Sequence, residues 1–285
     1  MQQADLAVLV NAAQQLESSS LATSISHTIG MPIETAMAVL PGHWSNIVSR
    51  ITRKALEKAL NAALYSLKKK PVKPKNKTHK LLVCISGAIG GSFGITALAV
   101  ELPLSATLML RSIADIARSY DEDLTTLESK MACLTVFALS GGGMAKVSSS
   151  SEAADTSYYA VRSFLTKALG DTTNHIAVHG LSKEGAPLMV KFINAVAVRF
   201  SIPVSEKVAA QSLPVVGALG GVSVNWLFIE HYQKMAKAHF SIRSLERKYG
   251  DKTVEGLYQD IVKYNNKQNT KEWELNKSYA SNSTI

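Results

Sequence analysis

The chain has 285 residues and a formal net charge of +9 at pH 7, with 31 Lys and Arg residues against 22 Asp and Glu residues. This excess favours an anionic partner, either a phospholipid surface or nucleic acid. Aromatic residues make up 7% of the chain and are not interleaved with the basic ones, and zinc-finger spacing is absent, so we exclude nucleic acid as the partner. The two cysteines, Cys84 and Cys133, lie in apolar sequence, which predicts reduced, buried thiols in a cytoplasmic protein.

Residues 1–67 predict an N-terminal helical arm followed by an amphipathic helix. The first residues lack the basic start and apolar core of a secretory signal, so we expect a protein that is not secreted. Residues 4–40 mix short apolar clusters with Ser, Thr and Gly, and a Pro-Gly pair at 41–42 ends this weakly defined helix. From Ile47 to Leu67 apolar residues recur at helical spacing, which is typical of an amphipathic helix.

The segment 68–80, KKKPVKPKNKTHK, combines seven lysines with two prolines and contains no acidic residue. Prolines and charge repulsion predict an extended, solvated segment. One interpretation is a linker. The other is a patch for an anionic membrane surface, to which each lysine would contribute about 1 kcal/mol of attraction. The patch consists of Lys68, Lys69, Lys70, Lys73, Lys75, Lys77 and Lys80.

Residues 81–100 carry no charge and are long enough to cross a bilayer as a helix. Four glycines and several polar residues lower the hydrophobicity of this segment, and the mean hydropathy of the whole chain is only +0.06. It is therefore either a membrane helix or the buried centre of a soluble helical protein. Its four-residue glycine spacing permits close helix packing in both settings. Because neither G-x-G-x-x-G nor P-loop spacing is present, we do not expect nucleotide binding.

The rest of the chain predicts further helices and no strands. Three glycines end a low-charge helix, and a Ser-rich loop precedes the next one. The predicted helices cover 131–144, 158–169, 186–200, 205–229, 226–249 and 254–264, with breaks near Pro203 and Pro214. Residues 265–285 are polar and predict a disordered tail. The predicted fold class is all-α, a multi-helix bundle with Gly-rich apolar central helices.

Several of these stretches resemble the bacterial EcsC family. The resemblance covers roughly residues 50–260 and defines an EcsC-like helical core at 81–264. It implies a membrane-associated protein linked to an ABC transporter, since the family takes its name from the third gene of such a transporter operon. It implies no defined reaction and no catalytic residues. The matching stretches are ALEKALNAALYSL at 55–67, GAIGGSFGITALAVELP at 87–103, LRSIADIARSYDEDL at 110–124, RFSIPVSEKVAAQSLPVVGALGGVSVN at 199–225, HYQKMAKAHF at 231–240 and IRSLERKYG at 242–250.

Two predicted helices each carry three polar or charged side chains at the spacing i, i+4, i+7. A helix that is apolar on two sides is usually buried, so charges on it must be paired. We hypothesise that the two triads meet in one buried network that keeps the helices in register or binds a ligand. The alternative is a ladder within each helix, worth a few tenths of a kcal/mol per pair. The triads are Arg111, Asp115 and Arg118, and His239, Arg243 and Glu246.

Glu101 and Glu230 each end an uncharged stretch that begins with a related glycine motif, GAIGG at 87–91 and GALGG at 217–221. Each glutamate either marks a membrane boundary or supplies a ligand or proton acceptor inside the bundle. The repeated E-x-x-H of di-iron bundles is missing, and HIAVH at 175–179 lacks the glutamate of a zinc peptidase. We therefore predict no metal and no cofactor.

Two functions remain open. The first is a membrane-associated accessory or binding protein at the cytoplasmic face of the inner membrane, peripheral or partly inserted. Its partners would be an anionic membrane surface and a membrane protein such as a transporter. The second is a soluble enzyme or ligand-binding protein that uses the Arg/Asp/His cluster on an anionic or lipid-like substrate. A cavity beside the cluster, or a shifted pKa of His239, favours the second function, and a dry, tightly packed network excludes it.

Overall fold

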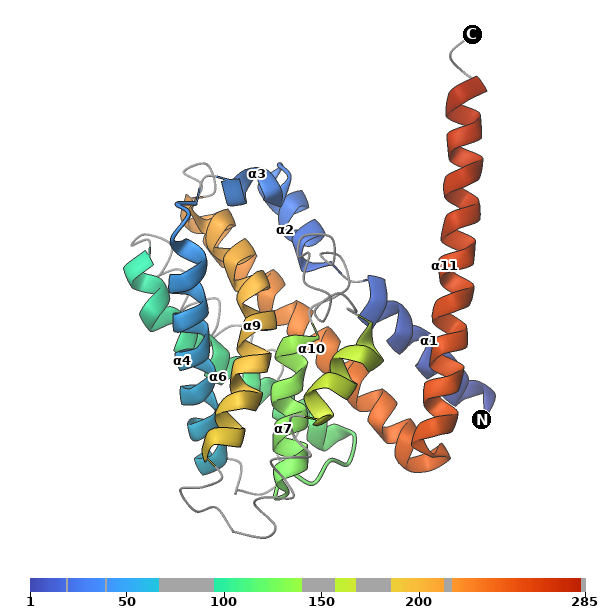
Figure 1. The fold of residues 1–285 in the computed structure, drawn as a ribbon, viewed down its shortest axis with the longest axis horizontal. Coiled ribbons are helices and arrows are strands. Elements are labelled where there is room, and N and C mark those ends of the chain that lie inside the picture. Colours follow the sequence, from blue (N-terminus) through green and yellow to red (C-terminus); the bar gives the residue numbers. More distant parts are fainter. Residues whose placement is uncertain are drawn as a thin grey trace.

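The computed structural model describes residues 1–18, 20–38, 40–66, 95–139, 157–167, 186–212 and 217–282. Within these ranges every regular element is a helix and no strand is present (Figure 1). The predicted all-α fold class is therefore confirmed. The Lys-rich segment 68–80 and most of the uncharged stretch 81–100 lie outside the described residues. In the described part, no helix is both long enough and apolar enough to cross a membrane.

The N-terminal arm consists of three helices instead of one: α1 (Gln3–Ser18), α2 (Leu21–Ile29) and α3 (Ile33–Ala38). Ser20 begins α2, because its hydroxyl accepts a hydrogen bond from the Thr23 N–H. Gly30 ends the same helix with a φ of 73°, a left-handed conformation that glycine adopts without a steric penalty. These local signals divide the arm before the predicted break at Pro41.

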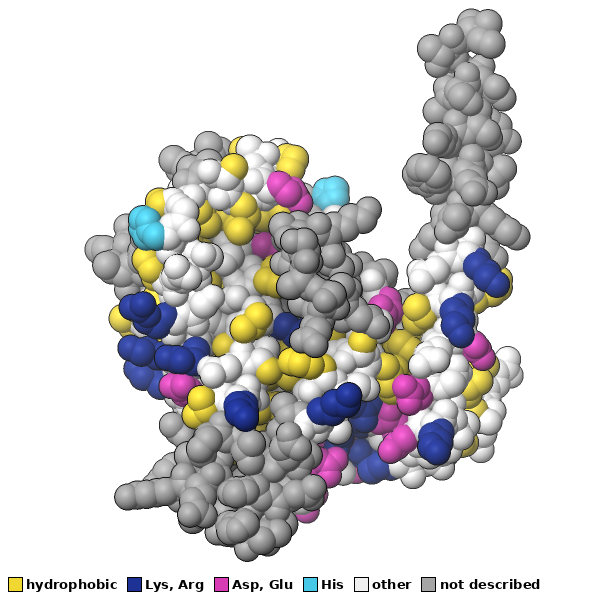
Figure 2. All heavy atoms as spheres, viewed as in Figure 1, with side chains coloured by type: hydrophobic (Ala, Val, Ile, Leu, Met, Phe, Trp, Pro, Cys, Tyr) yellow, Lys and Arg dark blue, Asp and Glu magenta, His cyan; other side chains and the backbone are white. Residues whose placement is uncertain are grey.

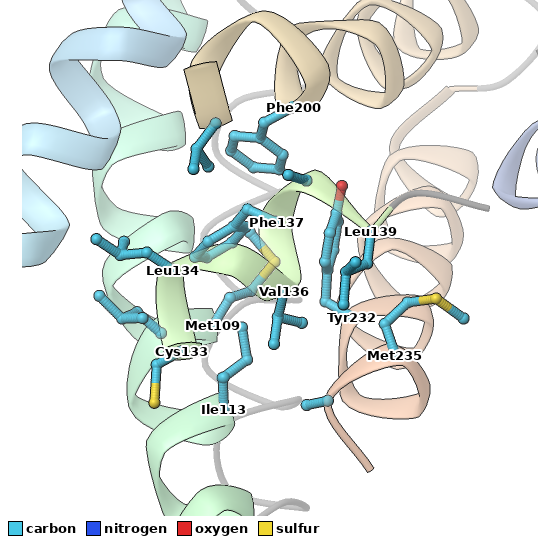
Figure 3. Packing of buried hydrophobic residues seen from close by; sticks show 14 of the residues in the cluster. Met109, Ile113, Cys133, Leu134, Val136, Phe137, Leu139, Phe200, Tyr232 and Met235 are labelled. Carbon is cyan, nitrogen blue, oxygen red and sulfur yellow. The ribbon is translucent and has the colours of Figure 1, made fainter. Parts of the chain in front are cut away.

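Three long helices form the centre of the molecule: α6 (Ile95–Ser119), α9 (Ala186–Gln211) and α10 (Gly217–Tyr249). The amphipathic helix α4 (Trp44–Ser66) packs against both α6 and α9, and α10 contacts α1, α2, α6 and α9. Between them lies an aromatic centre, in which the Phe137 ring centroid is 4.7 Å from that of Phe200 and 5.4 Å from that of Tyr232 (Figure 3). Burial of these large rings stabilises the contact between three separate elements.

The predicted break near Pro203 is wrong, because α9 continues through this residue to Gln211. A proline inside a helix removes one backbone hydrogen bond and costs about 3 kcal/mol. Phe200 and Val204, on either side of Pro203, are both fully buried. The packing of these two side chains offsets the cost. Helix α6 likewise continues through a proline, Pro103, which lies between the buried Leu102 and Ser105. Pro214 lies outside the described residues.

Two further helix boundaries differ from the prediction. The helix predicted at 131–144 begins earlier, as α7 (Leu127–Thr135) after an N-cap at Thr126, and continues as a 3₁₀ turn (Val136–Ala138). A helix at 158–167 starts at the predicted residue.

The predicted helix end at Tyr264 is wrong, because α11 (Asp251–Asn282) extends into the segment assigned to a disordered tail. Neither proline nor glycine follows Gly256 to end this helix, which projects from the body of the molecule (Figure 1).

Candidate functional site

The polar triad of α10 lies in a half-buried network with partners from two other parts of the chain. Arg243 donates from Nε to Glu122 Oε1 at 2.8 Å and from Nη2 to Glu122 Oε2 at 3.2 Å. Its Nη2 also donates to Glu128 Oε1 at 3.1 Å. Glu122 accepts additional bonds from Ser129 Oγ at 2.9 Å and from Arg247 Nη1 at 2.5 Å. Burial of Glu122 opposes its ionisation, but these donors outweigh it and lower the pKa of the carboxyl.

Glu246 forms a bidentate ion pair with Arg162 of the helix at 158–167. Both Nη–Oε distances are 2.6 Å, and the Tyr159 hydroxyl donates to Glu246 Oε1 at 2.9 Å. Planar fork geometry makes such pairs strong and directional. The guanidinium of Arg162 is therefore fixed in position beside α10.

His239 is joined to this cluster through Tyr158, and that contact indicates which ring nitrogen carries the proton. Arg162 Nη1 donates to the Tyr158 hydroxyl oxygen at 3.2 Å, so the Tyr158 hydroxyl is free to donate its own proton to His239 Nδ1, 3.0 Å away. Burial, together with the charges of Arg162 and Arg243, lowers the pKa of His239 well below its ordinary value. A neutral imidazole that accepts at Nδ1 carries its proton at Nε2.

The Nε2 atom of His239 is buried and has no hydrogen-bond partner among the described residues. His239 also lines a cavity of about 320 Å³, a volume comparable to that of small-molecule sites. The charged lining is Arg162 and Arg243 against Glu128 and Asp251. The remaining lining residues are two hydroxyl side chains, Thr135 and Thr166, and three apolar ones, Ala132, Leu165 and Phe192. Both features that favour a ligand-binding function, a cavity beside the cluster and a shifted pKa of His239, are therefore present.

The triad on α6 has different contacts. Asp115 and Arg118 pair with each other along the helix, with an Oδ1–Nη1 distance of 2.8 Å, and Arg111 is exposed to solvent. Arg243 and Glu246 pair instead with Glu122, Glu128 and Arg162. The sequence analysis did not single out these three partners. A signal was present for each, in the acidic YDED turn at 120–123, in the glutamate two residues after Thr126 and in the Tyr-Tyr pair three and four residues before Arg162.

The two glutamates that end uncharged stretches lie in different environments. Glu101 is buried and pairs with Lys207 of α9 at 2.6 Å, and the two side chains are only 5% and 0% exposed. Lys207 Nζ also lies 5.2 Å from the centroid of the Phe228 ring. Glu230 is half-buried, accepts a bond from Trp226 Nε1 at 3.1 Å and pairs with Lys234 at 3.6 Å.

A second cavity, of about 260 Å³, lies between α2 and α10 and is lined by Glu230, His231 and Lys234 together with Ser20, Thr23 and Ser24. His231 is buried and its Nε2 has no partner among the described residues. Burial, followed by the charge of Lys234, lowers the pKa of His231 to about 4. This ring is therefore neutral at physiological pH.

The remaining candidate groups do not add a reactive site to the described part of the chain. Cys133 is buried, and burial together with the charge of Glu122 raises the pKa of its thiol, which disfavours a reactive thiolate. The described residues contain no group of three or more His, Cys, Asp or Glu side chains placed to hold a metal ion. Cys84, the HIAVH segment at 175–179 and the seven lysines of the patch lie outside the described residues.

Comparison with known proteins identifies one family. Residues 2–245 match the model of the EcsC protein family, and the match includes the three central helices α6, α9 and nearly all of α10. No curated protein and no solved structure matches the chain. The resemblance based on short stretches of sequence is therefore confirmed over most of the chain.

Proposed function

The chain belongs to the EcsC protein family, and on that premise we propose that it is a binding protein whose ligand occupies the cavity lined by α7, α10 and the helix at 158–167. The observation that carries this proposal is the Nε2 atom of His239, a buried ring nitrogen that has no partner among the described residues, on a side chain that lines a cavity of about 320 Å³. A buried donor without an acceptor costs about 1–3 kcal/mol, and native proteins retain few of them. A ligand oxygen in the cavity would remove this cost.

The neighbouring residues prepare the site for such a ligand. Tyr158 orients the His239 ring through Nδ1, and Arg162 orients Tyr158. Glu246 in turn fixes Arg162 through two bonds of 2.6 Å. Side chains that are fixed before binding lose little conformational entropy when the ligand arrives. This arrangement supports binding of a ligand beside His239.

The test is a titration of protein labelled with ¹⁵N in its histidine rings. The two probes are octanoate and octanamide, which share an apolar chain and differ in the charge of the oxygen acceptor. We expect at least one probe to shift the Nε2–H signal of His239, because a new acceptor changes the shielding of that proton. His239→Leu should abolish binding. His231→Leu is the matched control and should leave binding unchanged. Like His239, His231 is a buried ring of α10 whose Nε2 has no partner among the described residues, but it lines a different cavity. If neither probe moves the His239 signal, the proposal is wrong.

A second candidate function is attachment to an anionic membrane surface on the cytoplasmic side, next to a transporter or another membrane protein. It is favoured by exposed apolar residues on α9, among them Val198 at 67% exposure and Ile202. Val198 lies beside Arg50 and Arg53 of α4 in a shallow surface hollow. Figure 2 shows apolar side chains over α9 and basic ones on the side where α4 lies. The same helix, α4, precedes the lysines of segment 68–80 in the sequence.

Flotation with anionic and neutral liposomes tests this second function. We expect retention on anionic vesicles that weakens at high salt, because attraction between lysines and lipid is screened by ions. Val198→Asp should weaken retention, whereas Val8→Asp, at an exposed apolar position of α1, should not. A protein that stays at the bottom of the gradient under all conditions would exclude membrane attachment.

A further inference from the structure

We propose that the ligand of the His239 cavity carries an anionic group on an apolar chain, and that this group replaces Glu128 on Arg243. This inference rests on the proposed function and specifies its ligand class. In the structure, the carboxylate of Glu128 occupies the position at Arg243 that the ligand anion would take. The Glu128 side chain thus fills part of the proposed ligand-binding site.

The two carboxylates on Arg243 are held very differently. The Glu122 side chain is 2% exposed and accepts bonds from Ser129, Arg243 and Arg247. The Glu128 side chain is 68% exposed and reaches Arg243 through one contact of 3.1 Å. An ion pair with one exposed partner contributes little to stability, because water solvates the carboxylate when it leaves. Glu128 can therefore be exchanged for another anion, while Glu122 keeps Arg243 in place.

The charges of the cluster also favour an anion. Three arginines, Arg162, Arg243 and Arg247, face three glutamates, Glu122, Glu128 and Glu246, through the ion pairs described above. When Glu128 moves into solvent, the network has one positive charge in excess. A carboxylate or phosphate on the ligand restores the balance through its contact with Arg243. Asp251, which also lines the cavity, is exposed on α11 and is solvated without a partner from this network.

Three apolar side chains of the lining form a surface suited to an apolar chain. Ala132 and Phe192 are fully or nearly fully buried, and Leu165 is buried beside them in the lining. These apolar side chains lie beside charged and hydroxyl groups, which suits a ligand that has both an apolar and a charged part. The shared chemistry is therefore an anion on an apolar chain, for which a free fatty acid and a phosphorylated lipid fragment are two sources.

The experiment measures dissociation constants by calorimetry for the full chain and for Glu128→Gln. The probes are octanoate, octyl phosphate, neutral octanamide and acetate. For the unsubstituted protein we expect octanoate or octyl phosphate to bind roughly tenfold more tightly than octanamide, and acetate to bind weakly because it lacks the chain. Glu128→Gln should tighten the anionic probe about threefold to tenfold, since it removes the competing carboxylate, and should leave octanamide unchanged. Because Glu128 is exposed, this variant is expected to fold normally.

Asp251→Asn is the matched control, since it removes one negative charge beside the same cavity without touching Arg243. It should tighten the anionic probes much less than Glu128→Gln does. Equal effects of the two substitutions would show a general charge effect and overturn the role of Glu128.

Equal binding of octanoate and octanamide would overturn the anionic ligand while leaving the proposed function standing. Acetate binding as tightly as octanoate would overturn the apolar chain, and absence of binding by every probe to both proteins would overturn the inference and the proposed function together. Whichever of octanoate and octyl phosphate binds more tightly identifies the anionic group.

Discussion

His231 and His239 lie about two turns apart on α10, and each ring is buried with Nε2 unpartnered among the described residues. Tyr158 holds the ring of His239 through Nδ1, and the ring of His231 packs edge-on against Tyr232 at a centroid distance of 5.2 Å. Both imidazoles must stay neutral, because a charge in such surroundings is costly. At the scale of single residues, these two side chains make the folded state sensitive to acid.

His231 gives a quantitative prediction of this sensitivity. Its pKa is about 4 in the folded protein and 6.5 in the unfolded chain, so the unfolded chain binds the proton first. Above pH 6.5 the ring is neutral in both states, and the free energy of unfolding has its full value. This free energy decreases as the pH falls towards 4, because the unfolded chain gains the proton and the folded protein does not. The loss amounts to about 3 kcal/mol of unfolding free energy.

Urea unfolding of His231→Leu checks this prediction. Between about pH 8 and about pH 4, the free energy of unfolding should decrease in both proteins. The decrease should be about 3 kcal/mol smaller for the variant than for the unsubstituted protein. The control is His27→Leu at an exposed position of α2, which leaves His231 in place and should keep the loss of stability that His231 causes. An unchanged pH profile of His231→Leu would contradict the assignment.

At the scale of elements, one ion pair joins two of the central helices. Glu101 of α6 and Lys207 of α9 are in contact at 2.6 Å in the core, with Phe228 of α10 beside the ammonium group. Taking both charges out of water costs nearly as much as their attraction returns. The pair therefore contributes little net stability, but either partner alone would be an unpaired buried charge.

Lys207→Met should consequently destabilise the protein by about 3–5 kcal/mol, because it leaves the Glu101 carboxylate unpaired. The double variant with Glu101→Met should recover most of this loss, since it removes both charges and keeps the packing volume. Urea unfolding of the two single variants and the double variant measures the coupling. Lys234→Met, in the exposed pair with Glu230, should cost less than about 1 kcal/mol. A double variant as unstable as Lys207→Met would show that packing, not charge, is responsible.

Helical spacing in the sequence was sufficient to place some polar residues and not others. It placed His239, Arg243 and Glu246 along one part of α10, where the structure shows them together in one cluster. Their partners lie 81 to 121 positions away in the sequence, so only tertiary packing brings them close. Periodicity within a helix does not encode such contacts. For the same reason, Lys207 gave no sign in the sequence that it would be buried.

The helix boundaries show the same division between local and tertiary causes. The starts of α2 and α7 follow local caps at Ser20 and Thr126 that depend on single hydroxyl groups. Pro203 is a local signal that burial of Phe200 and Val204 overrides. The all-α class was predictable because no segment shows the alternating pattern of a strand, whereas individual helix ends depend on packing.

At the scale of the whole molecule, α11 is held at its first half. Val254 and Tyr258 are buried, and the Tyr258 hydroxyl donates to Glu17 of α1 at 2.7 Å. Glu17 also accepts a bond from the Tyr158 N–H at 3.1 Å, so one carboxylate connects α1, α11 and the helix at 158–167. The far half of α11 extends away from the body (Figure 1).

Tyr258→Phe should therefore destabilise the protein by about 1–2 kcal/mol, because it removes one hydrogen bond to a charged, half-buried carboxylate. Shortening the chain to end at Lys267 should leave the melting temperature nearly unchanged, since the buried contacts of Val254 and Tyr258 remain. Thermal unfolding monitored by circular dichroism compares the two variants. A large loss on shortening would show that the far half of α11 contributes to the core.

The contact of α1 with the end of α10 has a consequence for how the protein is made. Asp5 of α1 pairs with Lys248, 243 positions later in the sequence, at 2.7 Å. A ribosome that adds 5–20 residues per second needs roughly 12–50 s to synthesise the intervening chain. During that time Leu9, Ala13 and Leu16, which are buried in the finished molecule, have no α10 to cover them. The α1 helix thus presents an apolar face to chaperones until α10 has emerged.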